Sequence, residues 1–287
     1  MEQASEKTKS FVLASGLAGG IAGVVVDFIV FPIEAIKTQI QASNNKIDFK
    51  KMASQNSKYK GFSAQFISAF PFAFLYFFTY EEGKRILRNT PSLNLNLQHM
   101  IAAGIAEAIG NLFRSPFEVV KQQQQVGWDK QIKQTILTIY KLNGIKGFYA
   151  GFSTLLMRDI PYSVIQYPLY DKMRQIEQIN KRKRENLPEN AEVNLSFVES
   201  SKCGAVAAAV ASFVTTPLDV IKTKLMTQRD GYYKGPLDAL KKTVAEEGGM
   251  ALFKGVKHRV LPLSFTGTIY FTVYEQARNF LSKKMQY

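Results

Sequence analysis

Cysteine and histidine are almost absent from this sequence. The single cysteine, Cys203, excludes a disulfide bond within the chain of 287 residues. With only two histidines beside it, few ligands remain for a zinc site, so we expect neither a metal nor another cofactor. The sequence also offers no nucleophile paired with a base, as an enzyme would need. We therefore expect Cys203 to be a small packing residue and the protein not to be an enzyme.

Acidic residues are also few. The chain carries 37 Lys and Arg against 23 Asp and Glu, a net charge of +14, which favours nucleic acid or an anionic membrane surface as partner. The basic residues flank apolar segments and do not line one face with aromatic residues between them, so nucleic acid is not expected. The first ten residues, MEQASEKTKS, lack the Arg-rich amphipathic pattern of a cleavable targeting peptide. These features favour an anionic membrane surface as the partner.

The chain contains long apolar runs, although its mean hydropathy is only −0.10. Residues 61–80 hold no charge and residues 11–32 hold one; at ~1.5 Å per residue, the latter segment would reach about 33 Å, enough to cross a bilayer core. Polar residues interrupt 198–217 and 255–274, and charges lie within 98–116 and 152–170. We predict an all-α membrane protein with six transmembrane helices in these segments.

Two motifs recur three times in the same order. The first places an acid two residues and a lysine five residues after a proline, in FPIEAIKTQIQ (31–41), SPFEVVKQQQQ (115–125) and TPLDVIKTKLM (216–226). The second is a Tyr-acid-x-x-base group nineteen residues after a glycine: Gly61 to YEEGK (80–84), Gly151 to YDKMR (170–174), and Gly255 to YEQAR (274–278). Such recurrence indicates a structural repeat, so we predict one domain, 1–287, built from repeats at about 8–95, 96–190 and 195–285.

The two motifs resemble those of the mitochondrial carrier family, and the resemblance covers the whole chain. It implies six transmembrane helices in three pseudo-symmetric two-helix repeats, with short matrix helices between them. It also implies a multi-pass protein of the mitochondrial inner membrane, in contact with lipid, including an anionic lipid such as cardiolipin.

An acid and a base three residues apart lie on one face of a helix, and three symmetric copies place alternating charges around a ring. The resemblance implies two such rings, which act as gates. The lower ring, the matrix gate, would pair Glu34 with Lys121, Glu118 with Lys222 and Asp219 with Lys37, braced by Gln41 and Gln125. The upper ring, the cytoplasmic gate, would pair Glu81 with Arg174, Asp171 with Arg278 and Glu275 with Lys84, braced by Tyr80, Tyr170 and Tyr274. The prolines Pro32, Pro116 and Pro217 would kink their helices.

Polar residues that occur in one repeat only are candidates for binding the substrate. Asp27 lies five residues before Pro32 and Glu107 nine before Pro116, so these acids share a helix face about one turn apart. A charge within a span is costly and usually faces a watery cavity. The candidate substrate-binding residues are Asp27, Glu107, Arg114, Arg158, Asp159, Tyr162 and Gln166.

These charges fit a solute that carries both cationic groups and a carboxylate, that is, a zwitterionic or net-cationic amino-acid-like substrate. A nucleotide carrier would need surplus bases for the phosphates. The segments LLMRDIPYSVIQYPLYD (155–171), VVVDFIVFP (24–32) and GIAEAIGNLFRSPFEVVKQ (104–122) resemble the S-adenosylmethionine carrier subgroup. The resemblance implies antiport of S-adenosylmethionine against S-adenosylhomocysteine, with the acids on the cationic groups and Arg158 on the carboxylate.

Two other functions remain open. Ala69 and Phe72 stand where the subgroup carries small polar side chains, which implies a narrower and more apolar cavity wall. The chain could thus be a structural subunit of carrier fold within a larger inner-membrane (respiratory) complex, with reduced or no transport. Alternatively, it could carry another cationic or zwitterionic amino-acid-like substrate. Two intact rings of charge favour transport, because a static subunit has no need of gates.

Overall fold

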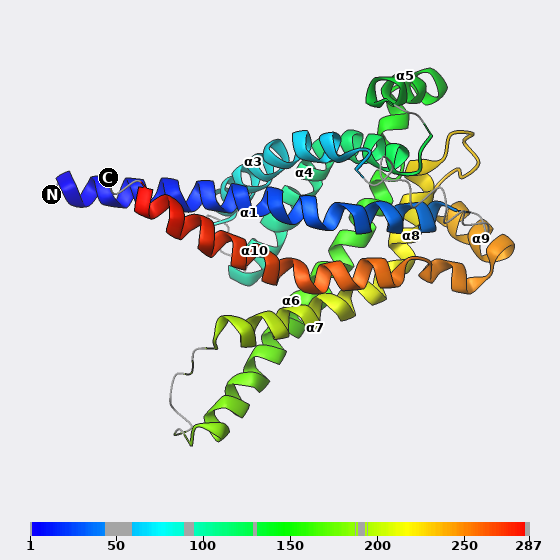
Figure 1. The fold of residues 1–287 in the computed structure, drawn as a ribbon. Coiled ribbons are helices and arrows are strands. Elements are labelled where there is room, and N and C mark those ends of the chain that lie inside the picture. The colour runs from blue at the N-terminus through cyan, green and yellow to red at the C-terminus, as the bar shows by residue number, and fades with distance from the viewer. Residues whose placement is uncertain are drawn as a thin grey trace. The chain divides into compact units, whose positions relative to one another are not determined.

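The computed structural model describes residues 2–43, 59–88, 95–128, 131–186, 188, 193 and 195–284, and every element within this part of the chain is helical. Figure 1 shows these helices. In chain order they are α1 (Glu2–Ala42), α3 (Phe62–Leu87), α4 (Leu95–Gln125), α5 (Ile132–Asn143), the 3₁₀ helix η2 (Gly144–Tyr149), α6 (Phe152–Arg184), α7 (Phe197–Val214), α8 (Thr216–Thr227), α9 (Pro236–Glu247), the 3₁₀ helix η3 (Gly249–Phe253) and α10 (Val256–Lys284).

The three repeated prolines do not act alike. Pro32 and Pro116 lie inside α1 and α4, which both continue through them. The corresponding helix of the third repeat is interrupted at Thr215, and Pro217 lies in the first turn of α8. Proline is well placed there because the first N–H groups of a helix have no partner within the helix. The third expected kink is therefore a break between two helices.

The three repeated glycines adopt a left-handed backbone conformation, with φ of 87° at Gly61 and 75° at Gly151 and Gly255. Each directly precedes a long helix, α3, α6 or α10. Each also packs against the backbone of a lower-ring lysine: an added Cβ would lie 2.7 Å from the carbonyl oxygen of Lys121 at Gly61, 3.3 Å from that of Lys222 at Gly151, and 3.4 Å from that of Lys37 at Gly255. Glycine is needed at these positions because it alone combines a positive φ with so close an approach.

Contacts divide the chain into two compact units. Unit 1 comprises residues 1–32, 164–213 and 257–287, and unit 2 comprises 33–163 and 214–256. In unit 1, α7 buries the small residues Cys203, Ala207, Ala208 and Ala211. Cys203 is a free thiol. The end of α6 is tied to the start of α7 by Lys181 and Glu199, whose Nζ and Oε2 atoms are 3.1 Å apart.

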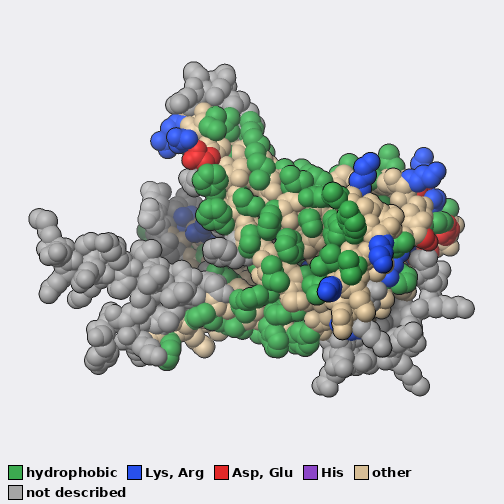
Figure 2. All heavy atoms as spheres, turned by 90° about the horizontal axis from the view of Figure 1, so that it is seen from above, with side chains coloured by type: hydrophobic (Ala, Val, Ile, Leu, Met, Phe, Trp, Pro, Cys, Tyr) green, Lys and Arg blue, Asp and Glu red, His purple; other side chains and the backbone are tan. Residues whose placement is uncertain are grey.

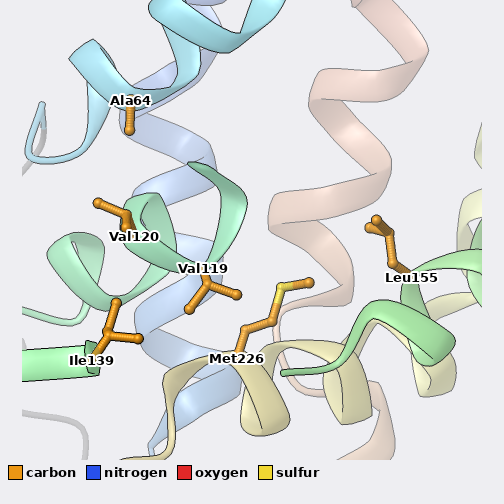
Figure 3. Close-up of a cluster of buried hydrophobic side chains, with 6 residues drawn as sticks. All are labelled: Ala64, Val119, Val120, Ile139, Leu155 and Met226. Atoms are coloured by element: carbon orange, nitrogen blue, oxygen red, sulfur yellow. The ribbon is translucent and has the colours of Figure 1, made fainter. Parts of the chain in front are cut away.

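Unit 2 contains a hydrophobic core to which all three repeats contribute. Its six buried side chains come from five helices and are drawn in Figure 3: Ala64 from α3, Val119 and Val120 from α4, Ile139 from α5, Leu155 from α6, and Met226 from α8. A second cluster, Ile221, Leu225, Tyr233 and Ala239, packs α9 onto α8. These clusters hold the ends of α4 and α8, which carry four of the six lower-ring residues.

Many large apolar side chains lie on the surface. Along α3, Phe66, Ile67, Phe74 and Phe78 are each more than half exposed, and Figure 2 shows hydrophobic side chains over much of the visible face. Soluble proteins rarely expose such continuous apolar surface, whereas lipid covers it. By length and composition alone, α3 and α7 of the described helices are apolar enough to span a membrane. Of the other expected spans, 98–116 and 152–170 contain the charges of Glu107, Arg114, Arg158 and Asp159.

Candidate substrate site and charge ring

The structure brings together all three residue pairs expected in the lower ring, all of them within unit 2. The N···O distances are 3.0 Å for Lys37 and Asp219, 2.9 Å for Lys222 and Glu118, and 3.5 Å for Lys121 and Glu34. Asp219, Glu118, Lys121 and Lys222 are buried, while Glu34 is about one-third exposed. The three pairs thus form a ring in which the Lys121–Glu34 pair is longer and more exposed than the other two.

The ring is a network and not three separate pairs. Lys121 also lies 3.3 Å from Glu118 of its own repeat, and its Nζ donates to Gln65 Oε1 at 3.2 Å. Glu118 in turn accepts a hydrogen bond from Gln122 at 2.9 Å. A buried ion pair that loses one partner leaves an uncompensated charge, which costs about 3–5 kcal/mol. Opening this ring is therefore more costly than separating pairs at a protein surface, and it requires compensating partners.

The two expected glutamine braces differ. Gln41 Nε2 donates to Asp219 Oδ2 at 3.0 Å, and Gln41 Oε1 accepts from Thr223 Oγ1 at 2.8 Å. The side-chain amide of Gln125 is fully buried and has no hydrogen-bond partner among the described residues. Within the described part of the chain, Gln125 therefore makes no side-chain hydrogen bond that could brace the ring, in contrast to the expectation. The tight Lys37–Asp219 pair is the braced one.

Three of the candidate substrate-binding residues, Glu107, Arg158 and Asp159, lie in one chain of contacts. Arg158 forms an ion pair with Asp159, and its Nη1 donates to Oδ1 of the lower-ring acid Asp219 at 3.2 Å. Asn111 Nδ2 donates to Glu107 Oε1 at 2.8 Å and to Asp159 Oδ2 at 3.3 Å. We call Glu107, Asn111, Arg158 and Asp159 the Arg158 cluster. It is joined directly to the lower ring through Asp219.

Two polar atoms of the Arg158 cluster are buried and have no hydrogen-bond partner among the described residues. They are Arg158 Nε, a donor, and Asn111 Oδ1, an acceptor. Buried polar groups are normally paired, so an orphaned donor and an orphaned acceptor within one cluster point to a ligand or to water. One atom is suited to a carboxylate and the other to an ammonium group.

Arg114 lies between the Arg158 cluster and the ring along α4. Its Nη2 is 3.9 Å from Glu118 Oε2, and its guanidinium lies over the ring of Phe72 at 5.2 Å. Phe72 packs against Gly110, where an added Cβ would lie 2.9 Å from the phenyl ring. The aromatic residue that departs from the subgroup pattern therefore fills a gap between α3 and α4.

The other candidates are placed by unit and by burial. Asp27 and Gln166 belong to unit 1 and Tyr162 to unit 2, and all three are half-buried. In the upper ring, the side chains of Glu81, Tyr274, Glu275 and Arg278 lie outside the described residues. Lys84 lies over the ring of Tyr80 at 4.7 Å, Tyr170 packs near Gly204 of α7, and Asp171 and Arg174 are exposed. These assignments stay predictions.

Sequence reasoning missed three polar residues: Asn111, Gln65 and Thr223. Asn111 lies four residues after Glu107 in an apolar run, which places both on one helix face and could have revealed it. Thr223 follows the motif lysine as Thr38 does in the first repeat, which could have revealed it, whereas Gln65 follows no repeated pattern. Their roles depend on contacts between helices that only the structure shows.

Comparison with known proteins agrees with the motifs. The family model described as "Mitochondrial carrier protein" matches residues 8–91, 94–181 and 193–285. The chain belongs to the mitochondrial carrier family. The predicted family and the predicted six-helix, all-α carrier fold are thereby confirmed. The members of this family are transporters, and the protein is a solute carrier.

Several relatives are similar to this carrier over nearly its whole length. A probable S-adenosylmethionine carrier 2, chloroplastic, of Arabidopsis thaliana is 36% identical over 94% of this chain and 75% of its own. The mitochondrial S-adenosylmethionine carrier proteins of Xenopus tropicalis and Mus musculus are 34% and 35% identical, over 94% and 93% of this chain and 97% and 94% of their own.

Proposed function

We propose that this carrier exchanges S-adenosylmethionine for S-adenosylhomocysteine across the mitochondrial inner membrane by alternating access. The named functions of its relatives support the substrate, and the mitochondrial ones among them support the location. The observation that carries the proposal is the position of Arg158. This arginine is shared between Asp159 and the lower-ring acid Asp219, and it retains a buried donor without a partner among the described residues.

The chemistry of the Arg158 cluster complements the amino-acid part of such a substrate. Arg158 would hold the carboxylate through Nε, and Glu107 and Asn111 Oδ1 would accept hydrogen bonds from the ammonium group. Asp159 and Glu107 together would favour the positive sulfonium. Asp27, assigned by its position in the sequence, is a further candidate acid for the substrate. A phosphate-bearing solute would meet too many acids here to bind.

The same contact suggests how the substrate would open the lower ring. If the substrate carboxylate binds Arg158 in place of Asp219, then Asp219 loses one of its donors and keeps Lys37 and Gln41. A hydrogen bond to a charged group contributes ~1.5–3 kcal/mol, so its loss would shift the closed–open equilibrium roughly ten- to hundredfold. Binding energy for the substrate would thus be used to open the gate.

The test is exchange of labelled S-adenosylmethionine by the purified protein in liposomes preloaded with S-adenosylhomocysteine. We expect Arg158→Ala and Asp27→Asn to reduce exchange at least tenfold. Arg85→Ala is the control, because Arg85 is exposed and its ion pair among the described residues is with Glu82 in the same helix. Unchanged uptake in both site variants would falsify the assignment of the site.

The same assay separates the alternatives. Exchange that an excess of arginine or lysine abolishes would indicate a carrier for basic amino acids. Absence of exchange, together with tight co-purification of respiratory subunits, would indicate a structural role.

A further inference from the structure

A cavity of about 670 Å³ lies at the ends of α1, α4 and α8, within unit 2. It includes Gln39 and Lys224, which follow the ring lysines Lys37 and Lys222 by two residues, and it contains no member of the Arg158 cluster. Along α8, Asp219 contacts Arg158, and the residues that line the cavity begin one turn later. The cavity therefore lies beyond the lower ring from the Arg158 cluster. We call it the end pocket.

The end pocket has aromatic walls held in fixed positions. Trp128 is about half exposed, and its indole N–H donates to the carbonyl of Thr227 at 2.9 Å. Tyr232 and Tyr233 meet edge to face, with ring centroids 4.9 Å apart. The backbone of Tyr233 is fixed by Gln228, which accepts from its N–H at 2.7 Å and donates to its carbonyl at 3.0 Å. Rigid aromatic walls bind flat rings with little loss of entropy on binding.

Charges of both signs surround these rings. The Arg229 guanidinium lies over the face of Trp128 at 5.1 Å, and Asp230 and Glu246 supply carboxylates to the lining. The other lining cation, Lys224, is buried and pairs with Glu247, which does not line the pocket. Ser43 Oγ also lines the pocket and has no hydrogen-bond partner among the described residues.

This combination repeats the chemistry of the Arg158 cluster and adds aromatic surface. One arginine suits a carboxylate, two acids suit an ammonium or sulfonium group, and a tryptophan suits a stacked purine. The volume lies within the range of about 300–1,000 Å³ that is usual for small-molecule sites.

We propose that the end pocket is a second binding station for an adenosyl amino acid. It holds the solute on the far side of the lower ring, with the purine on Trp128 and the carboxylate on Arg229. The choice of ligand rests on the proposed function, while the existence of the station rests on the pocket itself. A station there raises the local concentration of solute at the ring and supplies the return substrate of the exchange.

Trp128 provides a direct reporter because it is the only tryptophan of the chain. The experiment is a titration of the purified full-length protein with S-adenosylhomocysteine, followed by tryptophan fluorescence. N-acetyltryptophanamide, titrated in parallel, corrects for light absorbed by the purine. We expect saturable quenching in the wild type and in Arg158→Ala, which leaves the end pocket intact. In Arg229→Gln we expect the apparent Kd to rise about tenfold or more, as for loss of a charge-assisted hydrogen bond.

Three results would overturn the proposal: no saturable quenching in the wild type, loss of quenching in Arg158→Ala, or an unchanged Kd in Arg229→Gln. The second would mean that Trp128 senses only binding at the Arg158 cluster. If Arg229→Gln does not fold, Asp230→Asn serves in its place with the same expectation.

The liposome assay keeps the two proposals apart. Quenching without any exchange would contradict the proposed function and support the end pocket as a binding site. Exchange without quenching would contradict the end pocket alone.

Discussion

At the scale of single residues, the lower ring is asymmetric because its three acids have different partners. Asp219 is fully buried. It forms an ion pair with Lys37 and accepts hydrogen bonds from Gln41 and Arg158. Glu34, in contrast, is partly exposed and faces Lys121 at 3.5 Å. The pair that Arg158 reaches is thus also the pair with the most support, so we expect it to control opening of the ring.

The two glutamines of the motif provide a matched test. Gln41→Leu removes two buried hydrogen bonds and leaves Thr223 and Asp219 short of partners, which should destabilise the protein by about 1–3 kcal/mol. Gln125→Leu removes a buried amide whose side chain has no partner among the described residues, so it should be neutral or stabilising by about 1 kcal/mol. Thermal unfolding of both variants in the same detergent measures the difference, and a loss of stability in Gln125→Leu equal to that in Gln41→Leu would contradict the ring described above.

At the scale of elements, three glycines and three lysines join the repeats. Each glycine starts a helix of one repeat and lies on the backbone of a ring lysine in another. This contact sets how closely the helices approach, so the ring geometry depends on glycine as well as on charge.

Gly61→Ala should therefore destabilise the protein more than Gly127→Ala does. Both glycines have φ near +80°, where alanine costs ~1–2 kcal/mol. At Gly61 the new methyl group would also meet a carbonyl oxygen, at 2.7 Å, whereas at Gly127 no atom of the described residues would lie within 4 Å of it. The unfolding midpoints of the two variants test this, and equal midpoints would show that the contact at Gly61 relaxes freely.

Helix α9 is held by a buried carboxylate. Glu247 pairs with Lys224 of α8 and with Lys254, whose Nζ is 2.5 Å from Glu247 Oε2. Burial alone would raise the pKa of Glu247, but hydrogen bonds from the two lysines outweigh it and leave the pKa below its ordinary value. The pKa of Glu247 is lower in the folded than in the unfolded protein. Its ion pairs with Lys224 and Lys254 therefore stabilise the protein above pH ~4.5, and this stabilisation is lost as the pH falls below that value.

Glu247→Gln should accordingly lower stability at pH 7 by about 3 kcal/mol, because Lys224 and Lys254 lose their buried counter-ion. The deficit relative to wild type should shrink as the pH approaches 4. Glu82→Gln, which alters an exposed pair with Arg85, should cost at most ~1 kcal/mol and is the control. Unfolding midpoints from pH 4 to pH 8 provide the measurement, and a deficit in Glu247→Gln that does not change with pH would contradict this role.

At the scale of the whole molecule, repetition made the sequence informative. The family and the carrier fold followed from the two repeated motifs, and the lower-ring residues lie together as the repeats implied. What breaks the symmetry could not be predicted in the same way. The helix break at Thr215, the bridge through Asn111, and the amide of Gln125 that has no partner among the described residues all depend on local packing that no repeat encodes.

The contact between Arg158 and Asp219 has its main consequence at this scale, because under the proposed function it would couple the solute to the lower ring. A solute without a carboxylate could still bind through its cationic groups, but it would leave Arg158 on Asp219 and the ring closed. Decarboxylated S-adenosylmethionine is such a solute.

The most direct measurement compares S-adenosylmethionine with its decarboxylated analogue in the liposome exchange assay. We predict that the analogue inhibits uptake of labelled S-adenosylmethionine and is itself exchanged at least tenfold more slowly. An analogue that is exchanged as fast as S-adenosylmethionine would contradict the coupling of Arg158 to the lower ring.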